Sequence, residues 1–298
     1  MGDEMKKFLP MFAALFLVAL LLLHPDKAGA AVRDGLILCA STVIPSLFPF
    51  FVLTALLLCL GVDSILRPLC APLMTPLFRM RGECAAPLLA GFLGGYPTGA
   101  RSAAQLYEQG VLTREEAERL LGFCNNCGVG FLVGFVGAGI FSSVRLGIAL
   151  LGIHILSALL SGFVLCRIAP RSDLPRLPGN LPAQSMPLGA AFTASVSGAV
   201  TATLSVCAYV VFFRAVTALT ALSGILSGAV EMVGAVAALH KDVAGFAAAA
   251  GITAWGGVSV HCQTMAVAGD LSLRWHTAGK VLQTVFAVVL AVIVGRWM

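Results

Sequence analysis

Long apolar runs without charged residues follow one another along most of the chain. Four of them are long enough to cross a bilayer, which takes roughly 20 helical residues: Gly35–Val62, Leu120–Val144, Leu146–Cys166 and Val243–Gly269. The strict alternation of apolar and polar positions that a membrane β-barrel needs does not occur in the sequence. The pattern therefore predicts an all-α, polytopic membrane protein.

Glycine-rich stretches that keep polar side chains interrupt two of the apolar regions. The first is Gly94-Gly95-Tyr96-Pro97-Thr98-Gly99, and the second is Gly256-Gly257-Val258-Ser259-Val260-His261. A helix that stops at membrane depth leaves backbone groups that lipid cannot pair, so such breaks persist where protein or a watery cavity surrounds them. Breaks at corresponding positions of two halves indicate the binding site of a transporter.

The segments around these breaks are short. Residues 84–93 are apolar but too few to cross a bilayer, and 100–108 are amphipathic. We therefore predict a re-entrant helical hairpin over 84–108 and a second one over 245–270. Thr113 and Glu116 have the spacing of a capping box, which predicts the start of the next helix.

Several landmarks recur at offsets of 162 or 163 residues. Gly35 and Gly61 correspond to Gly198 and Gly224, and the two Gly-Gly pairs follow the same spacing. Three predicted spans separate equivalent points, and an odd number inverts the second half relative to the first. The spacing thus predicts two inverted repeats, as in many secondary transporters. The alternative is a set of unrelated spans in a chain that contains 32 glycines.

The repeats suggest four parts along the chain. An N-terminal membrane helix is predicted in 1–30, the first repeat with its connecting span in 31–168, a proline-rich linker in 169–187 and the second repeat in 188–298. The N-terminus has the layout of a secretory signal with a cleavage site, but the many spans that follow favour a retained helix. The last span is predicted over Leu271–Val294, entered through Trp275 and Lys280.

Composition agrees with a membrane protein and excludes other classes. The chain is 59% hydrophobic and 11% charged, whereas soluble domains carry about 25% charged residues. The net charge is +5, and the lysines and arginines lie mostly at segment ends. This distribution suits orientation by the positive-inside rule, whereas a nucleic-acid partner would need a clustered basic face. Nine scattered cysteines and a lone CxxC at Cys124–Cys127 predict no disulfide framework, metal or cofactor.

The first break offers groups for an anion. Backbone amides at the start of a helix carry partial positive charge and bind anions, and an arginine can hold a carboxylate in a two-pronged contact. The candidate ligands are Gly94, Gly95, Tyr96, Thr98, Gly99 and Arg101. Arg101 has an alternative role, in which it extends to the membrane interface.

Further candidates lie in two other polar interruptions. Asn125 and Asn126 interrupt an apolar helix, where a side-chain amide is costly unless it bonds a partner or a ligand. The second break adds Gly256, Gly257, Ser259, His261 and Gln263. His261 has a titration range suited to a switch, although a lone histidine is more often a structural donor.

Glu231 is the one charge in the apolar segment Leu222–Leu239. An isolated carboxylate in such a run is expected to face a cavity or a basic partner, with Arg214 as the candidate, and to bind a proton or a sodium ion. The alternative is an interfacial helix with the carboxylate in water. An intramembrane enzyme that uses Glu231 and His261 is another class to consider, but the sequence contains neither an HExxH nor a GxSxG motif. We therefore predict no enzymatic activity.

Four stretches together carry a resemblance to a known family: Ile44–Phe51, Gly91–Ala100, Leu112–Asn126 and Gly256–Gln263. They resemble the sporulation integral membrane proteins of the YlbJ type, which contain a nucleoside-recognition (gate) domain. The resemblance implies an organisation similar to that of concentrative nucleoside transporters. It also implies transport of dipicolinate, a planar aromatic dianion, during endospore formation.

The expected function is therefore transport of a small organic anion, dipicolinate by resemblance, through alternating access. The expected partners are membrane lipid, the anionic solute and a coupling ion, and a homo-oligomer stays open. The expected location is the cell membrane, and the outer forespore membrane if the resemblance extends to sporulation. The alternatives are a transporter of nucleosides or other small solutes, and a structural protein of the sporulation envelope.

Overall fold

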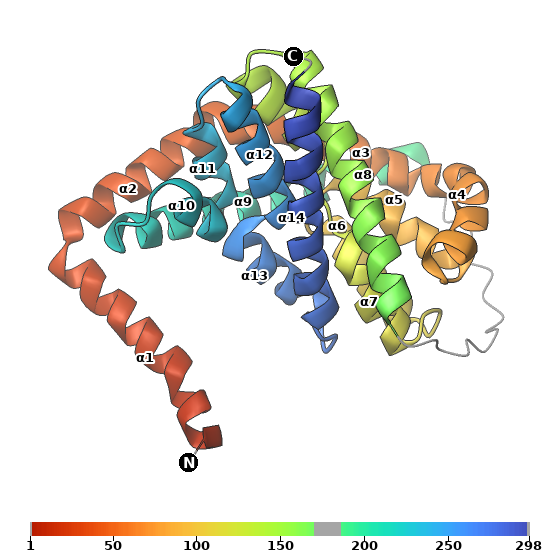
Figure 1. Cartoon of the computed structure of the whole chain (residues 1–298), viewed down its shortest axis with the longest axis horizontal. Coiled ribbons are helices and arrows are strands. Elements are labelled where there is room, and N and C mark those ends of the chain that lie inside the picture. Colours follow the sequence, from red (N-terminus) through yellow and green to blue (C-terminus); the bar gives the residue numbers. More distant parts are fainter. Residues whose placement is uncertain (1, 170–185, 297–298) are drawn as a thin grey trace.

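The computed structural model describes residues 2–169 and 186–296, and this part of the chain consists of helices and loops without a β-strand. Figure 1 shows their arrangement. The helices are α1 Gly2–Leu23, α2 Pro25–Leu38, α3 Ile44–Cys59, α4 Val62–Phe78, α5 Ala85–Gly94, α6 Thr98–Glu108, α7 Arg114–Cys124, α8 Val144–Ile168, α9 Leu188–Leu219, α10 Gly224–Val230, α11 Met232–Ala237, α12 Val243–Trp255, α13 Gly257–Ala268 and α14 Arg274–Gly295. Shorter or wider helical turns cover Cys39–Val43, Gly82–Cys84 and Gly130–Ile140.

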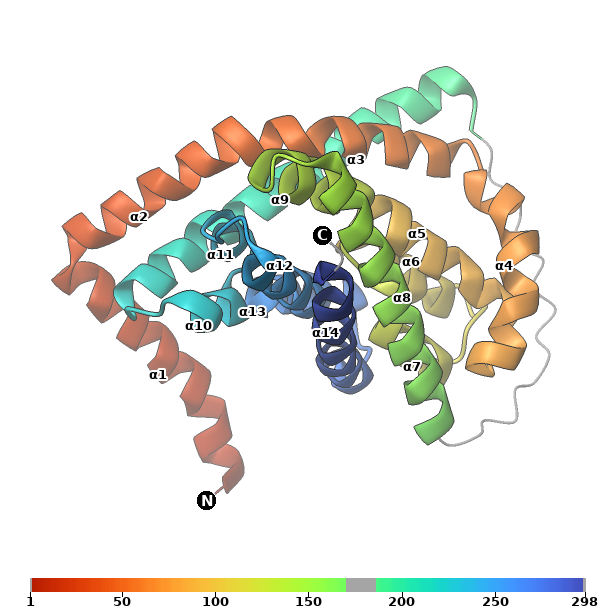
Figure 2. The same cartoon turned by 45° about the horizontal axis from the view of Figure 1, so that its top comes forward.

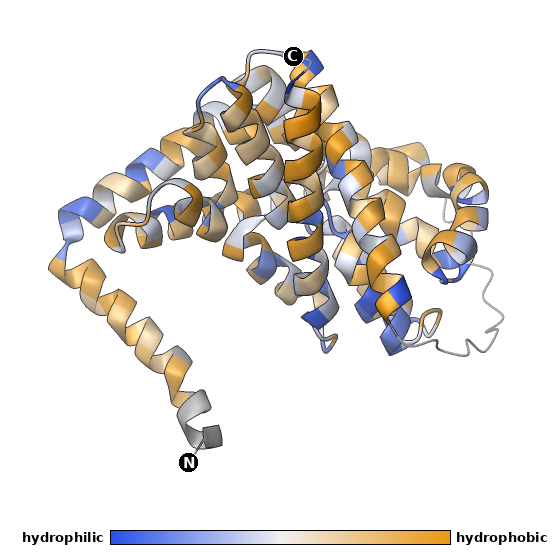
Figure 3. Cartoon of the chain, in the orientation of Figure 1, coloured by the Kyte–Doolittle hydropathy of each residue, from blue (hydrophilic) through white to orange (hydrophobic). Residues whose placement is uncertain are grey.

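Within the described residues, five stretches are long and apolar enough to cross a membrane. They are Pro25–Cys59, Val144–Ile168, Leu188–Leu219, Val243–Ala268 and Arg274–Gly295. Figure 3 shows hydrophobic residues over most of α1, α3, α8 and α14, and many of their large apolar side chains are exposed. Exposed apolar surface of this extent fits contact with lipid. The all-α, multi-pass prediction is confirmed.

Two long helices form an outer layer over the remaining elements. Figure 2 shows that α2 and α3 run as one curved rod beside α9. The absence of a side chain at Gly35 allows α2 to approach α9 closely, because a Cβ there would lie 3.2 Å from the Cα of Val211. The helices that build the central site lie on the inner side of this layer, whereas α1 extends away from the other helices.

Residues 84–108 fold as two helices that pack against each other. α5 and α6 are joined by Gly95, Tyr96 and Pro97, and the glycine has a φ of +78°, which favours glycine. Both arms also rest on the end of α7: a Cβ on Gly91 or on Gly99 would overlap the carbonyl oxygen of Cys124. Small residues at these points are therefore required for the close packing of the pair against α7.

The second break has a different shape from the hairpin that the sequence predicted over 245–270. α12 and α13 meet at Gly256 alone and together make up one candidate span of 26 residues, Val243–Ala268, and Figure 1 shows α13 continuing beyond α12. Gly256 and Gly257 both have left-handed backbone conformations, with φ +83° and +76°, and bend the helix here, whereas the reversal between α5 and α6 uses three residues. The compact pair in this half is α10 and α11, which meet at Glu231.

The same order of elements therefore occurs twice along the described chain. A helix pair comes first, as α5–α6 and as α10–α11. An interrupted helix follows: α7 ends at Cys124 and helical structure resumes near Gly130, and α12 ends at Trp255 before α13. An uninterrupted helix, α8 or α14, closes each series.

The predicted capping box at the start of α7 is confirmed. The Thr113 side chain accepts a hydrogen bond from the Glu116 amide (3.2 Å), and the Glu116 carboxylate accepts one from the Thr113 amide (2.9 Å). Glu116 is buried and also binds Arg81, with Nη2 to Oε2 at 2.7 Å. Hydrogen bonding to Glu116 raises the pKa of Arg81, so Arg81 keeps its positive charge in this contact.

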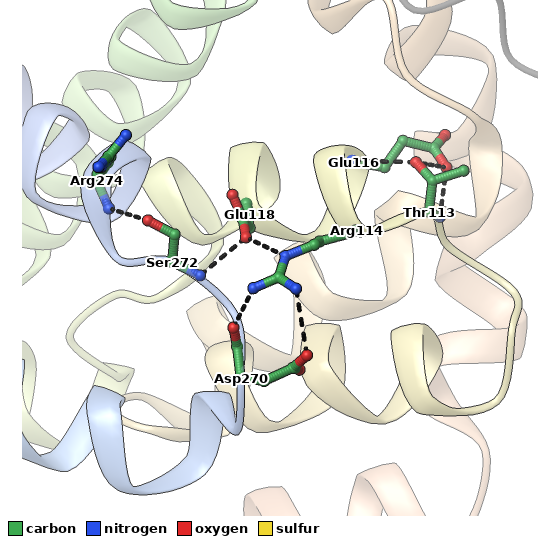
Figure 4. Close-up of polar contacts among 7 residues, drawn as sticks. All are labelled: Thr113, Arg114, Glu116, Glu118, Asp270, Ser272 and Arg274. Carbon is green, nitrogen blue, oxygen red and sulfur yellow. Dashed lines mark hydrogen bonds and ion pairs between the residues drawn. The ribbon is translucent and has the colours of Figure 1, made fainter.

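A second polar cluster ties the start of α7 to the loop before α14 (Figure 4). Arg114 contacts Glu118 at 2.8 Å and Asp270 at 3.3 Å, and Glu118 accepts a hydrogen bond from the amide of Ser272 at 2.9 Å. These groups are largely exposed, and exposed ion pairs contribute little stability individually. Their effect is to hold the start of α7 beside the loop before α14, because Arg114 and Asp270 are 156 residues apart in sequence.

Replacing Thr113 by alanine should lower the stability of the protein by about 1 kcal/mol, the usual cost of losing a helix cap. Thermal unfolding in detergent measures the change. Ser223→Ala is the matched control, because Ser223 stands at the N-cap of α10 but makes no capping hydrogen bond. Equal melting temperatures for both variants would show that the Thr113 cap contributes nothing.

Candidate functional site

A cavity of about 590 Å3, counting its open side, lies between the first helix pair, α3, α9 and the second break. Elements from both halves of the chain meet here. The lining residues are Leu47, Phe50, Phe51, Thr54, Leu93, Gly94, Gly95, Tyr96, Cys127, Gly128, Gly130, Phe131, Val206, Tyr209, Val210, Glu231, Met232, Val233, Ser259, Val260 and Gln263.

The wall of this central cavity is aromatic and apolar with few polar groups. Five aromatic residues line it: Phe50, Phe51, Tyr96, Phe131 and Tyr209. The side-chain carboxylate is that of Glu231, and no lysine or arginine lines the cavity within the described chain. Such a surface fits a flat ring, since aromatic side chains bind rings by stacking and edge contacts.

The cavity gathers some of the residues predicted from the sequence. Gly94, Gly95 and Tyr96 come from the connection between α5 and α6, and Ser259 and Gln263 come from the first turns of α13. The two breaks therefore face one cavity although 162 residues separate them in the sequence.

Other predicted residues lie away from the cavity. Arg101 is exposed on α6, and Thr98, Gly99 and His261 do not line the wall. Gly256 and Gly257 are buried and form the bend between α12 and α13. Arg101 is thus not positioned to pair with a carboxylate in the central cavity.

Asn125 and Asn126 lie one layer behind the cavity wall and are fully buried. The Asn125 amide donates to the Thr264 hydroxyl (2.7 Å), and the Asn126 amide donates to the carbonyl of Phe123 (2.7 Å). Both side-chain NH2 groups therefore have acceptors at membrane depth, whereas Asn125 Oδ1 has no partner among the described residues. These side chains connect the break after α7 to α13 and to the end of α7 itself.

A buried lysine, Lys280, is the centre of the polar groups in this layer. It lies on α14 and its Nζ donates to Tyr96 Oη (3.1 Å), Gln283 Oε1 (2.8 Å) and the carbonyl oxygen of Asn125. In the sequence, Lys280 stands near the entrance of the predicted last span, where no site role was expected. A charge inside an apolar helix is a general signal of function and was the available indication.

Gln283 and His154 extend this network. Gln283 Nε2 donates to Asn126 Oδ1 at 3.1 Å and lies 3.2 Å from His154 Nε2. His154 Nε2 also accepts from the backbone amide of Cys127 at 3.1 Å, so this nitrogen is an acceptor and the ring proton is assigned to Nδ1. Both residues lie in spans that the sequence alone presented as ordinary apolar helices.

Glu231 caps α11 and lines both the central cavity and a second one. Its carboxylate oxygens accept hydrogen bonds from the amides of Val233 and Gly234, both at 2.6 Å. The second cavity has about 1090 Å3, counting its open side, and Asp34, Arg214 and Glu231 are its charged lining residues. A side chain at Gly234 would collide with the Arg214 guanidinium and the Glu231 carboxylate, so the two charges face each other across Gly234. Arg214 thus stands where a counter-charge for Glu231 was predicted.

His261 lies against two aromatic rings instead of lining either cavity. Its ring centroid is 4.5 Å from that of Trp255 and 4.9 Å from that of His276. His276 in turn contacts the carbonyl of Leu121 at 3.1 Å. Since His261 and Glu231 do not share a cavity, the geometry gives no support to an enzyme that uses both.

The described residues contain no group of three or more histidine, cysteine, aspartate or glutamate side chains that could hold a metal ion. The cysteines are free thiols. Cys127 donates to the Thr253 carbonyl (3.5 Å) and lies 3.8 Å from the sulfur of Met232, so it packs the α7 break against α11 and α12.

Comparison with known proteins places this geometry in a family. The sequence profile of the Gate family, described as nucleoside recognition, matches residues 40–208. This stretch contains α3, the first helix pair and the break at Asn125–Gly128. The match covers more than half of the chain.

A named relative adds detail. The chain is 37% identical over 151 residues to the sporulation integral membrane protein YlbJ of Bacillus subtilis (strain 168), a match that covers 51% of this chain and 37% of that protein. The chain therefore spans well under two thirds of the relative's length. No solved structure matches. The chain belongs to the nucleoside-recognition Gate family.

Proposed function

We propose that the chain is a membrane transporter that binds a small planar solute in the central cavity. The observation that carries the proposal is that one aromatic cavity joins both breaks, with Tyr96 from the first and Gln263 from the second among its lining residues. Interrupted helices around a central cavity are the usual construction of a transporter site. The Gate family match supports a small-molecule solute.

An uncharged ring is the solute class that the wall favours. No cationic side chain lines the cavity within the described chain, and the carboxylate of Glu231 would repel an anion. A nucleoside combines a flat base with polar groups that Gln263 and Ser259 can bind. Dipicolinate is the second candidate: the resemblance to a sporulation protein supports it, and Lys280 places a positive charge behind Tyr96.

We also infer that the two series of helices are inverted repeats, as in concentrative nucleoside transporters. The repeated order of helix pair, interrupted helix and uninterrupted helix supports this inference. In these repeats, α5–α6 corresponds to α10–α11, and the break at Asn125 corresponds to the break at Gly256. This replaces the correspondence between the two Gly-Gly motifs that the sequence predicted. Alternating access would then move helix pairs relative to the outer layer.

Glu231 is the proposed site of a coupling proton or sodium ion. It is 2% exposed and lines both cavities, so it contacts the central solute space on one side and the space beside Arg214 on the other. A carboxylate between two cavities can take up a cation from one and release it to the other. The proposed location is the cell membrane, with the outer forespore membrane as the specific proposal if the role is in sporulation.

Uptake by proteoliposomes tests the transport proposal. We expect labelled uridine to enter vesicles that contain the full chain and to exceed dipicolinate in competition. Gln263→Leu should reduce uptake at least tenfold, because an amide that binds a polar solute group is lost and a buried polar group of the solute is left unpaired.

Arg101→Gln is the matched control for that experiment. Arg101 is exposed and away from the cavity, so this variant should transport at the wild-type rate. Loss of uptake in Arg101→Gln would favour the anion site predicted from the sequence. Folded protein that takes up neither solute under any proton or sodium gradient would favour a structural role in the envelope.

A further inference from the structure

The ammonium of Lys280 sits where two interrupted elements meet. Its three hydrogen-bond acceptors come from the connection of the first helix pair (Tyr96), from the break after α7 (the carbonyl of Asn125) and from α14 itself (Gln283). The residue is fully buried. Lys280 and Tyr96 are 184 positions apart in sequence, so this contact joins the two halves of the chain.

The surrounding hydrogen bonds suit an ammonium at this position. The Tyr96 hydroxyl donates to the carbonyl of Thr253 (3.3 Å), and the Gln283 amide nitrogen donates to Asn126 Oδ1 (3.1 Å). Both groups therefore turn an oxygen lone pair toward Nζ. Three acceptors match the three N–H donors of an ammonium, whereas a neutral amine has two.

Neutral dipoles alone surround this cation. Lys280 forms no ion pair with another described residue, unlike Arg81 and Arg114. The ring of Tyr96 adds a cation–π contact, with Nζ 5.0 Å from its centroid. A carbonyl oxygen, a hydroxyl and an amide oxygen are also the ligands that a monovalent metal cation prefers, and unwound carbonyls coordinate coupling cations in secondary transporters.

We propose that Lys280 serves as a built-in cation that occupies the position of a coupling ion at the break after α7. It holds the tip of the first helix pair against that break, so the protein binds no sodium or potassium ion there. Asn125 Oδ1 is a buried acceptor without a partner among the described residues, so the side chain beside this carbonyl also presents an unpaired oxygen. The consequence for ion coupling rests on the proposed transport function, whereas the cation site itself does not.

The test is the melting temperature of the full chain in detergent, in sodium, potassium or choline chloride at equal ionic strength. The wild type should melt at the same temperature in potassium and in choline chloride. Because Glu231 is a separate proposed sodium site, the sodium comparison uses a Glu231→Gln background, in which the parent protein should also show no shift. Lys280→Ala leaves the oxygen ligands and a space of ammonium size, so it should melt lower in choline and gain several degrees in sodium or potassium, with saturation as the concentration rises. A Lys280→Ala protein that ignores the cation would overturn the proposal.

Two further measurements keep the proposal testable if Lys280→Ala does not fold. The first is the melting temperature of Lys280→Met, which fills the space without a charge. This variant should melt at a lower temperature than the wild type, and no cation should stabilise it. A melting temperature equal to that of the wild type would show that no cation is needed. The second measurement is binding of labelled sodium by scintillation proximity. The wild type and Lys280→Arg should bind the same amount of displaceable sodium, because a side-chain cation already occupies this position in both. Sodium binding by the wild type that is lost in Lys280→Arg would contradict the proposal. Neither measurement requires transport, so failure of uptake and failure of this proposal are distinguishable.

Discussion

Replacing Gly91 by alanine is expected to destabilise the protein by about 3 kcal/mol, at the upper end of the usual cost of overpacking. A Cβ at this position would overlap the carbonyl oxygen of Cys124, which ends α7, while Gly99 on the facing arm contacts the same oxygen. A backbone carbonyl held from two sides cannot rotate away like a flexible side chain. The helix pair would have to leave the end of α7, and the wall of the central cavity would move with it.

Thermal unfolding in detergent measures this effect, with Gly152→Ala as the matched control. Gly152 lies within α8 and a Cβ there would meet no atom within 4 Å, so alanine should be neutral or slightly stabilising because it has the higher helix propensity. Similar melting temperatures for the two variants would show that the first helix pair does not pack on α7 as described.

Replacing Gln283 by leucine is the second large expected effect. The substitution removes one acceptor from Lys280 and the donor to Asn126. Each buried polar group left without a partner costs about 1–3 kcal/mol, and a charged one costs more. We expect a loss of roughly 3 kcal/mol or more, or a failure to accumulate folded protein.

Gln105→Leu is the control for Gln283→Leu. It makes the same chemical change at an exposed position of α6, where the effect of a surface substitution is usually within about 0.5 kcal/mol. Melting temperature and yield from size-exclusion chromatography give the readout. A Gln283→Leu protein as stable as Gln105→Leu would mean that the buried network around Lys280 contributes no net stability.

The sequence predicted the parts of the site that depend on local pattern. The apolar runs Gly35–Val62, Leu146–Cys166 and Val243–Gly269 predicted spans, and the spacing of Thr113 and Glu116 predicted a helix start. The run Leu120–Val144 did not form a single span, because α7 ends at Cys124. Each of the confirmed features is determined by residues within a few turns of one another, so a single segment of sequence is sufficient to indicate it.

The features that the sequence analysis missed depend on contacts between distant segments. Lys280 and His154 looked like residues of ordinary spans, and their importance arises from Tyr96, Asn125 and Cys127, which approach them through folding. The second hairpin was placed at the Gly-Gly pair because its offset matched the first. Glu231 instead joins the short helices α10 and α11, and a carboxylate that caps a six-residue helix leaves little periodic signal in the sequence.

The most direct test of the central claim is a structure of the protein in a lipid nanodisc with the solute that the uptake experiment selects. The account predicts density for the solute in the central cavity, between the ring of Tyr96 and the amide of Gln263. It also predicts that Glu231 lies at the edge of that density. Solute density beside Arg101 on the exposed face of α6, with the central cavity filled by side chains, would contradict the account.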